Sequence, residues 1–480
     1  MRTVVVVSIT VALAAALAVA GVVLWAGPGD LPPLSQAEAL VEARRYSAAL
    51  AVYEQLAARY PHDPGPYLRI AAIRRAQKLP ARAIESVLLG LARDPQNAAG
   101  LYLLGSLYAD QGNLTLAAEK LQASLAANPA QAGAHVALGR VFIRQGQLGP
   151  AQAQMALALG VDLSGLPNLT GLPEAHFYLA LLMAPHDVAA ARTHLAAIAT
   201  DPAFADRART FEAALAQVET ARQAGGDAYA LTTLGAGYLQ AGEPALAQPV
   251  LQHAVNIAPR YADAHAYLGN AAWLLGDAQA ALVELNTAIA LDASYAPAHH
   301  WRGLALHSMG RLDEAIAAFQ HALALQPAAV AGAAVCADLG AAYESQRDYP
   351  AAEEWLQKAV ALAPDSGPLA LRLAQFYVEH ALKVRDEGRT AATRATELLP
   401  AAAEAWELLG WAHYLAGEPT AARSALERAV ALDVDRPGAH YRLGVVLQAL
   451  GQADEARREF QAAIDLQPEG PWAARARPEL

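Results

Sequence analysis

The chain has 480 residues, of which 55% are hydrophobic and 17% charged, and its formal net charge at pH 7 is −11. This acidic balance does not support a nucleic-acid-binding surface, which would need clustered Lys and Arg. The single cysteine, Cys336, excludes an internal disulfide bond.

The first predicted element is a membrane span. Residues 4–26 contain no charged side chain, and their 23 positions are enough to cross a hydrocarbon core of about 30 Å as a helix. Trp25 lies at the far end of this stretch, where an aromatic ring suits the membrane interface. We therefore predict an N-terminal transmembrane anchor within residues 1–30.

A cleaved signal peptide is the alternative interpretation of the same segment. Ala18-Val19-Ala20 fits a cleavage site, but the apolar run continues past it, which favours the anchor. Arg2 precedes the span, whereas Asp30 and Glu38 follow it. This charge bias favours an extracytoplasmic position for the rest of the chain, with the reverse orientation left open.

Beyond the anchor the sequence repeats. Glycine–alanine pairs twelve residues apart recur down the chain, and the step between successive pairs is often 34 residues. The pairs are Gly105/Ala117, Gly139/Ala151, Gly235/Ala247, Gly269/Ala281, Gly303/Ala315, Gly340/Ala352, Gly410/Ala422 and Gly444/Ala456. A fixed period of this length predicts a solenoid of stacked units.

Each unit is predicted to be a helical hairpin. In the unit that begins at Ala296, apolar residues recur at helical spacings on two short stretches, with Gly310 between them. Gly303 and Ala315 are small, so the two helices can approach closely. One hairpin cannot bury its apolar face alone, and neighbouring hairpins must therefore stack.

This pattern resembles the tetratricopeptide repeat family. The unit that begins at Pro437 has small residues at repeat positions 8, 20 and 27 (Gly444, Ala456, Ala463), an aromatic at position 24 (Phe460) and proline at position 32 (Pro468). The resemblance covers residues 30 to 470 in roughly twelve helix pairs. It implies an all-α, right-handed solenoid.

The period is interrupted between residues 164 and 225. Residues 164–174 are rich in Gly, Pro and Asn and predict a loop, while residues 204–223 predict one longer helix before Gly225-Gly226. This region separates an N-terminal array, 31–163, from a C-terminal array, 226–480. It is either a hinge or a degenerate repeat that still stacks, and we favour the degenerate repeat.

No pattern of catalytic or metal-binding residues stands out. The histidines at repeat position 4 (His135, His265, His299, His440) recur once per unit, so we expect them to pack within their repeats, and Cys336 occupies the same position. Sequence motifs for zinc peptidases, phosphate-binding loops and serine hydrolases are absent. Repeats also fill most of the chain. We therefore expect no enzyme activity, no cofactor and no metal.

The family resemblance implies a binding groove along the first helix of each pair, at positions 2, 5, 6, 9, 12 and 13. These positions include several aromatic residues and Arg, and both types are enriched at interface hot spots. The candidate groove residues are Tyr267, Asn270, Trp273, His300, Trp301, His307, Trp411, Tyr414, Tyr441 and Arg442, with Arg140 and Arg144 in the N-terminal array. The set that clamps a chaperone's terminal carboxylate is missing, because Ala266, Trp301 and Asp338 occupy three of its positions.

The sequence therefore predicts a membrane-anchored scaffold that binds a protein or peptide partner. The 31 Arg against 4 Lys indicate a GC-rich, bacterial genome. Envelope assembly, polysaccharide export or secretion is the expected setting, by analogy alone. The alternatives are an accessory subunit of a membrane enzyme complex and a glycan-binding module that uses the same aromatics. Neither the partner nor the oligomeric state follows from the sequence.

Overall fold

The computed structural model describes residues 31–160, 172–326 and 330–480. Within these ranges every regular element is a helix, and none of the described helices is long and apolar enough to cross a membrane. The predicted span at 4–26 lies outside the described residues, as does most of the predicted loop at 164–174. The chain divides into two compact units.

Unit 1 comprises Met1–Glu212 and Phe460–Leu480. Its complete helices are α2 (Leu31–Glu42), α3 (Tyr46–Arg59), α4 (Gly65–Ala76), α5 (Pro80–Leu91), α6 (Ala98–Asp110), α7 (Leu114–Ala127), α8 (Ala132–Arg144), α9 (Leu148–Gly160), α10 (Leu172–Met183), α11 (Val188–Ala197), α27 (Pro471–Ala476) and the 3-10 turn η2 (Arg477–Glu479). The division falls inside α12 (Ala205–Gly225) and α26 (Ala453–Leu466). Helix α12 occupies the place of the predicted longer helix.

Unit 2 comprises Ala213–Glu459. Its complete helices are α13 (Asp227–Gln240), α14 (Pro244–Ile257), α15 (Ala262–Leu274), α16 (Ala278–Leu291), α17 (Ala296–Ser308), α18 (Leu312–Leu325), α19 (Val330–Ser345), α20 (Tyr349–Leu362), α21 (Gly367–Glu379), the π-helix η1 (Val384–Gly388), α22 (Arg389–Leu398), α23 (Ala403–Leu415), α24 (Pro419–Leu432) and α25 (Pro437–Ala449).

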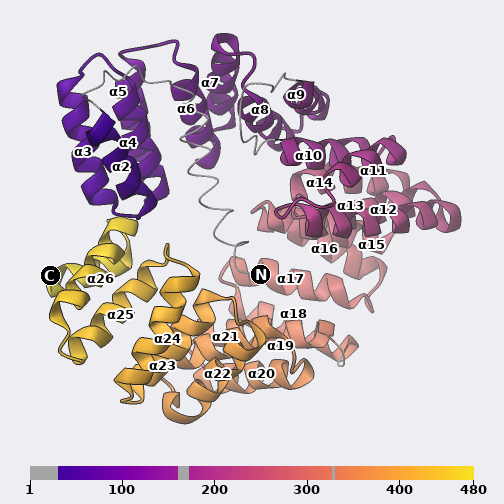
Figure 1. Ribbon diagram of the computed structural model, residues 1–480. Coiled ribbons are helices and arrows are strands. Elements are labelled where there is room, and N and C mark those ends of the chain that lie inside the picture. The colour runs from indigo at the N-terminus through magenta and orange to yellow at the C-terminus, as the bar shows by residue number, and fades with distance from the viewer. Residues whose placement is uncertain (1–30, 161–171, 327–329) are drawn as a thin grey trace. The chain divides into compact units, whose positions relative to one another are not determined.

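Successive helices pack as antiparallel hairpins, and the hairpins stack in chain order. In unit 2, α13 packs on α14, α15 on α16 and α17 on α18, and each second helix also contacts the next first helix (Figure 1). Neighbouring first helices, such as α15 and α17, touch each other directly. The prediction of an all-helical solenoid built from repeating hairpins is confirmed.

In the hairpins that have glycine at repeat position 8, the close contact between the two helices depends on that glycine. A Cβ atom added to Gly303 would lie 2.4 Å from a ring carbon of Phe319, and one added to Gly269 would lie 2.6 Å from Cγ of Leu285. Phe319 and Leu285 are fully buried at position 24. Glycine therefore provides the space that a large position-24 side chain fills.

The turn between the two helices has a left-handed residue at position 15. Gly276 and Gly310 have φ of +89° and +72°, which glycine adopts without steric cost. Arg347 and Lys78 occupy the same position with φ of +63° and +59°, respectively, in their hairpins. The turn thus has the same geometry where Arg or Lys stands in place of glycine, at a modest conformational cost.

The histidines at position 4 fasten their own hairpins to the turn that precedes each of them. Nε2 of His265 lies 3.1 Å from the carbonyl oxygen of Pro259, and Nδ1 lies 2.7 Å from the carboxylate of Glu284. His135 makes the equivalent pair of bonds through Pro129 and Gln154. These side chains are buried structural residues, as the sequence suggested.

His440 and His299 show how an acidic hydrogen-bond partner changes the pKa of the position-4 histidine. His440 bonds to the carbonyl of Val434 and to the Glu459 carboxylate, each an acceptor, so both ring nitrogens must donate. Burial opposes the imidazolium, but the bond and charge of Glu459 outweigh it and raise the pKa of His440. Among the described residues His299 has no acidic partner, and burial lowers its pKa.

The last residues of the chain complete the core of unit 1. The carbonyl of Asp465 accepts a buried hydrogen bond of 2.6 Å from Gln77, and its carboxylate accepts one of 2.6 Å from Ser47. Leu466 joins the apolar cluster that contains Val41 and Tyr53. Residues from both ends of the chain thus build one folded unit.

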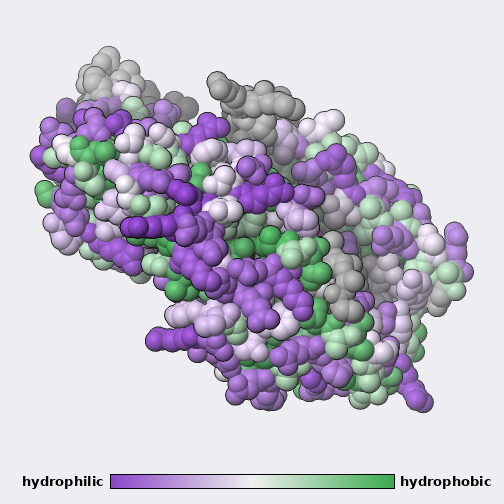
Figure 2. All heavy atoms as spheres, turned by 90° about the horizontal axis from the view of Figure 1, so that it is seen from below, coloured by the Kyte–Doolittle hydropathy of each residue, from purple (hydrophilic) through white to green (hydrophobic). Residues whose placement is uncertain are grey.

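In Figure 2 hydrophobic residues form patches between larger hydrophilic areas of the visible face. Several exposed apolar residues lie on second helices, among them Ile257 of α14 and Val283 of α16.

Gly303→Ala should destabilise its repeat by about 1–3 kcal/mol, because the added methyl group overpacks against the buried Phe319 ring. Hydrogen exchange of α17 and α18 amides, together with the melting temperature, measures this. Gly149→Ala on α9 is the control, since nothing lies within 4 Å of the added carbon and Ala favours helix. Equal protection in the two variants would contradict the packing account.

Glu459→Gln should destabilise the protein more at pH 6 than at pH 9. A raised folded-state pKa means that the stabilisation from the His440 imidazolium is complete below its ordinary pKa of about 6.5 and is lost as pH rises through the raised value. Melting temperatures at the two pH values test this. Glu427→Gln, on an exposed pair with Arg423, is the control. A pH-independent difference for Glu459→Gln would refute it.

Candidate partner-binding site

Tyr267, on α15, and Trp301, on α17, form an aromatic pair between neighbouring first helices. Their ring centroids are 5.1 Å apart. The Tyr295 hydroxyl donates a hydrogen bond to Tyr267, and burial raises the pKa of both phenols. Asn270 is half-buried on α15, while Trp273 packs against the core of the adjacent hairpins. Two repeats thus contribute to one aromatic cluster.

The first helices α17 and α19 are joined by hydrogen bonds between side chains. Nε2 of His300 on α17 lies 2.6 Å from the carboxylate of Asp338 on α19. His307, two turns further along α17, lies 3.0 Å from the Ser345 hydroxyl. Both histidines therefore bridge neighbouring repeats.

A second aromatic group lies on α23. Trp411 and Tyr414 stack with ring centroids 4.8 Å apart, and the Arg442 guanidinium from α25 lies 5.4 Å from the Trp411 ring centre. Arg442 is buried and bonds at 2.9 Å to the buried carboxylate of Glu407, which also accepts a bond from Arg436. Tyr441 is half-buried beside Arg442 in the sequence.

The two arginines predicted in the N-terminal array belong to unit 1. Arg140 on α8 forms an ion pair of 3.1 Å with Glu174 on α10. Arg144 donates a hydrogen bond of 2.7 Å to the carbonyl of Ala109 on α6. Both side chains are exposed and link consecutive repeats.

All the candidate residues therefore lie on first helices, but the contacts do not join them in one site. Those of unit 2 fall into an α15–α17 group and an α23–α25 group, which together we call the first-helix face. Many of these side chains hold neighbouring repeats together. No cluster of three or more potential metal-ligating side chains occurs among the described residues.

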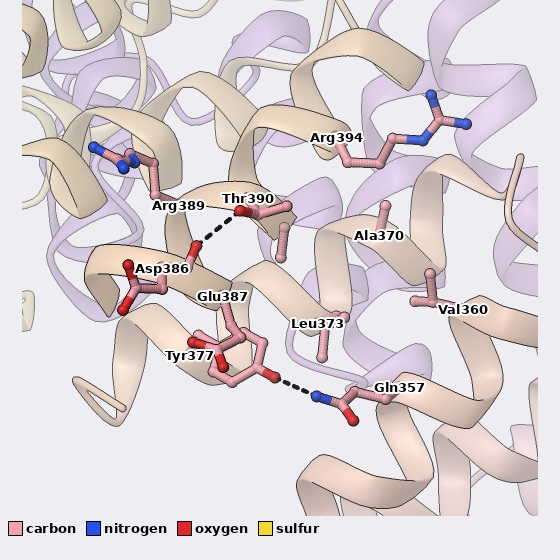
Figure 3. A pocket seen from close by; sticks show the side chains of 11 residues that line it. Gln357, Val360, Ala370, Leu373, Tyr377, Asp386, Glu387, Arg389, Thr390 and Arg394 are labelled. Atoms are coloured by element: carbon pink, nitrogen blue, oxygen red, sulfur yellow. Dashed lines mark hydrogen bonds between the residues drawn. The ribbon is translucent and has the colours of Figure 1, made fainter. Parts of the chain in front are cut away.

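Sequence reasoning missed a pocket between second helices. A cavity of about 500 Å³ lies between α20 and α22, with α21 and η1 completing its walls (Figure 3). The step from Gly340 to Gly410 is 70 residues, two more than two ordinary repeats. That excess was the available signal, because η1 lies in this interval.

The π-helix is held by its own backbone bond. The amide of Gly388 donates at 3.0 Å to the carbonyl of Lys383, five residues earlier. A Cβ at Gly388 would lie 3.1 Å from Cβ of Tyr377, so glycine permits the close approach to α21. The extra residues of η1 therefore place Asp386 and Glu387 in the lining of the pocket.

Family models for the tetratricopeptide repeat match residues 34–98, 102–160, 232–297 and 385–437. Two further models with the same description match residues 294–365 and 413–477.

The chain belongs to the tetratricopeptide repeat family. Proteins of this family mediate protein–protein interactions, and the fold is typical of non-catalytic scaffolds. No curated protein matches the chain.

Solved structures of other tetratricopeptide repeat proteins are similar over most of the chain. The APC/C hetero-tetramer Cut9-Hcn1 is 16% identical with a TM-score of 0.44, covering 98% of this chain and 99% of that one. Yeast Tom70 is 16% identical with a TM-score of 0.38, covering 94% and 95%, respectively. PilF of Pseudomonas aeruginosa is 20% identical with a TM-score of 0.37, covering 55% and 100%.

Arg442→Ala should lower stability by about 1–3 kcal/mol, because it removes one partner from the buried carboxylate of Glu407. Arg144→Ala, at an exposed position, should change stability by no more than about 0.5 kcal/mol. Chemical denaturation measures both. If Arg442→Ala were as neutral as Arg144→Ala, Arg442 would be a surface residue and not part of the packing.

Proposed function

We propose that the protein is a scaffold that binds a protein or peptide partner through the first-helix face of unit 2. The observation that carries this proposal is the pairing of aromatic and polar residues from consecutive first helices, above all Tyr267 with Trp301 and Trp411 with Tyr414. Rings held in fixed positions lose little entropy on binding. They can therefore supply much of the binding energy at an interface.

Residues 4–26 are proposed to anchor the scaffold in a bacterial membrane, with the repeats on the extracytoplasmic side. Their uncharged sequence supports this proposal. An anchor restricts the scaffold and its partner to one surface and raises their effective concentration. Envelope assembly, polysaccharide export or secretion is the proposed setting.

Photo-crosslinking tests the binding face directly. A photoreactive residue at His307 or Tyr414 should capture the same protein from membranes, identified by mass spectrometry. One placed on second helices, at Gln252 or the exposed Val283, should not. Recovery of the same protein at equal yield from both faces would contradict the proposal.

A charge variant sharpens the same experiment. With the photoreactive residue at His307, replacing Asn270 and Tyr414 by Glu should reduce crosslinking at least tenfold, because carboxylates desolvate poorly in an interface. The matched control keeps the photoreactive residue at His307 and places Glu at two exposed second-helix positions, Gln252 and Asn286. Trp273 and Trp301 are avoided because both pack against the core.

Topology has its own prediction. Protease added to intact spheroplasts should digest the repeats if they lie outside the cytoplasm. Protection until the membrane is lysed would contradict the extracytoplasmic orientation.

A further inference from the structure

We infer that a cluster of tyrosines at the start of α15 and α17 binds a basic side chain of the partner protein. This tyrosine cluster comprises Tyr229 of α13, Tyr261, Asp263 and Tyr267 at α15, and Tyr295 and Trp301 at α17. Because Tyr267 and Trp301 belong to the first-helix face, this assignment rests on the proposed function and specifies the chemistry of the partner's contact.

The cluster is built from the same repeat positions in consecutive repeats. The residue just before each first helix is a tyrosine, Tyr261 as the N-cap of α15 and Tyr295 as the N-cap of α17. Repeat position 6 is aromatic in both, as Tyr267 and Trp301, and repeat position 2 of α15 is Asp263. Since α15 and α17 contact each other directly, equal positions in the two repeats are neighbours. Two repeats thus gather four rings and one carboxylate.

The rings are fixed in place but remain partly exposed. The ring centroids of Tyr267 and Trp301 are 5.1 Å apart, and the Tyr295 hydroxyl donates a hydrogen bond to Tyr267. These three side chains are half-buried, and Tyr229 is 44% exposed. The cluster therefore offers accessible aromatic surface, to which the ring quadrupoles attract a cation.

Asp263 is a carboxylate without a cation. Its Oδ2 lies 3.5 Å from the Tyr261 hydroxyl, and no ion pair to it occurs among the described residues. Burial raises the pKa of Asp263 and the carboxylate of Asp292 adds to this, while bonds from the Tyr261 hydroxyl and from its own backbone amide oppose it without cancelling it. The ionised carboxylate is therefore short of positive charge, which a bound cation would supply.

Other aromatic groups of the protein already hold a cation from the chain itself. The ammonium of Lys358 lies 4.5 Å from the Trp355 ring centre, and the Arg442 guanidinium lies 5.4 Å from that of Trp411. Within the ranges that the structure describes, no Lys or Arg lies over a ring of the tyrosine cluster. This place is thus open to a basic group from another molecule.

Charge decides between the classes of ligand. The carboxylates of Asp263 and Asp292 both repel an anion. An uncharged sugar can stack on the rings, but it leaves the charge of Asp263 without a counterion. A Lys or Arg side chain places its cationic end against the rings and neutralises the carboxylate at the same time.

NMR of the tryptophan indole groups in the full chain tests the site. The basic probes are N-acetyl-lysine methylamide and N-acetyl-arginine methylamide, and the norleucine and citrulline derivatives are their uncharged counterparts. At least one basic probe should shift the Trp301 signal and bind at least fivefold more tightly than its counterpart, and the tighter of the two identifies the side chain. The Trp355 signal should not move, because Lys358 already lies beside that ring.

Three outcomes would overturn the site. They are no shift of Trp301 with either basic probe, equal binding of the uncharged counterparts, and a shift of Trp301 with an uncharged oligosaccharide but with neither basic probe. The last would assign the rings to a glycan.

A matched pair of variants identifies the carboxylate. Asp263→Asn should weaken binding of the tighter basic probe at least fivefold. Glu404→Gln removes the same charge at repeat position 2 of another first helix, α23, and should leave binding unchanged. Melting temperatures check that both variants are folded. Equal weakening by the two variants would show a general effect of net charge and would overturn the site.

The same probes separate this inference from the proposed function. If neither basic probe binds while photoreactive residues at His307 and Tyr414 still capture one protein, the cation site is wrong and the scaffold proposal stands. If a basic probe binds as expected but neither position captures a protein, the cation site stands and the scaffold proposal is contradicted.

Discussion

The whole architecture depends on how closely two helices approach at repeat position 8. Glycine there leaves room for a large side chain from position 24, and a small residue at position 20 lets the second helix come near. In the α17–α18 hairpin, an added methyl group at Gly303 would overlap the ring of Phe319. Each hairpin with this glycine thereby gains a filled core of its own. The remaining apolar surface is buried against the next hairpin, and this repeated step builds the solenoid.

Once the hairpins stack, much of the polar chemistry becomes structural. His265 and His440 bond to the preceding turn and to a carboxylate of their own repeat. His300 and Arg442 bond to residues of the neighbouring repeat. The proposed binding role would therefore place two demands on the same side chains of the first-helix face, since residues that hold repeats together would also contact the partner. Aromatic pairs meet both demands, because a ring can pack on one side and remain accessible on the other.

The sequence was sufficient to predict the fold because the period places Gly303 opposite Phe319 without reference to distant residues. It also predicted a longer helix close to α12. It could not predict that Arg442 is buried, since its partner Glu407 lies 35 residues earlier on another helix. The pocket could not be predicted from the sequence for a similar reason. Two extra residues were visible between Gly340 and Gly410, but their folding into η1 depends on contacts with α21 that no local pattern records.

A double-mutant cycle between Gly303→Ala and Phe319→Ala tests the central claim most directly. Each change should destabilise the repeat alone, the first by overpacking and the second by leaving a cavity. Together they should cost less than the sum by at least about 1 kcal/mol, because the new methyl group enters space left by the ring. Hydrogen exchange of α17 and α18 amides gives these free energies locally. Strictly additive effects would show that positions 8 and 24 do not control each other, and would contradict the account.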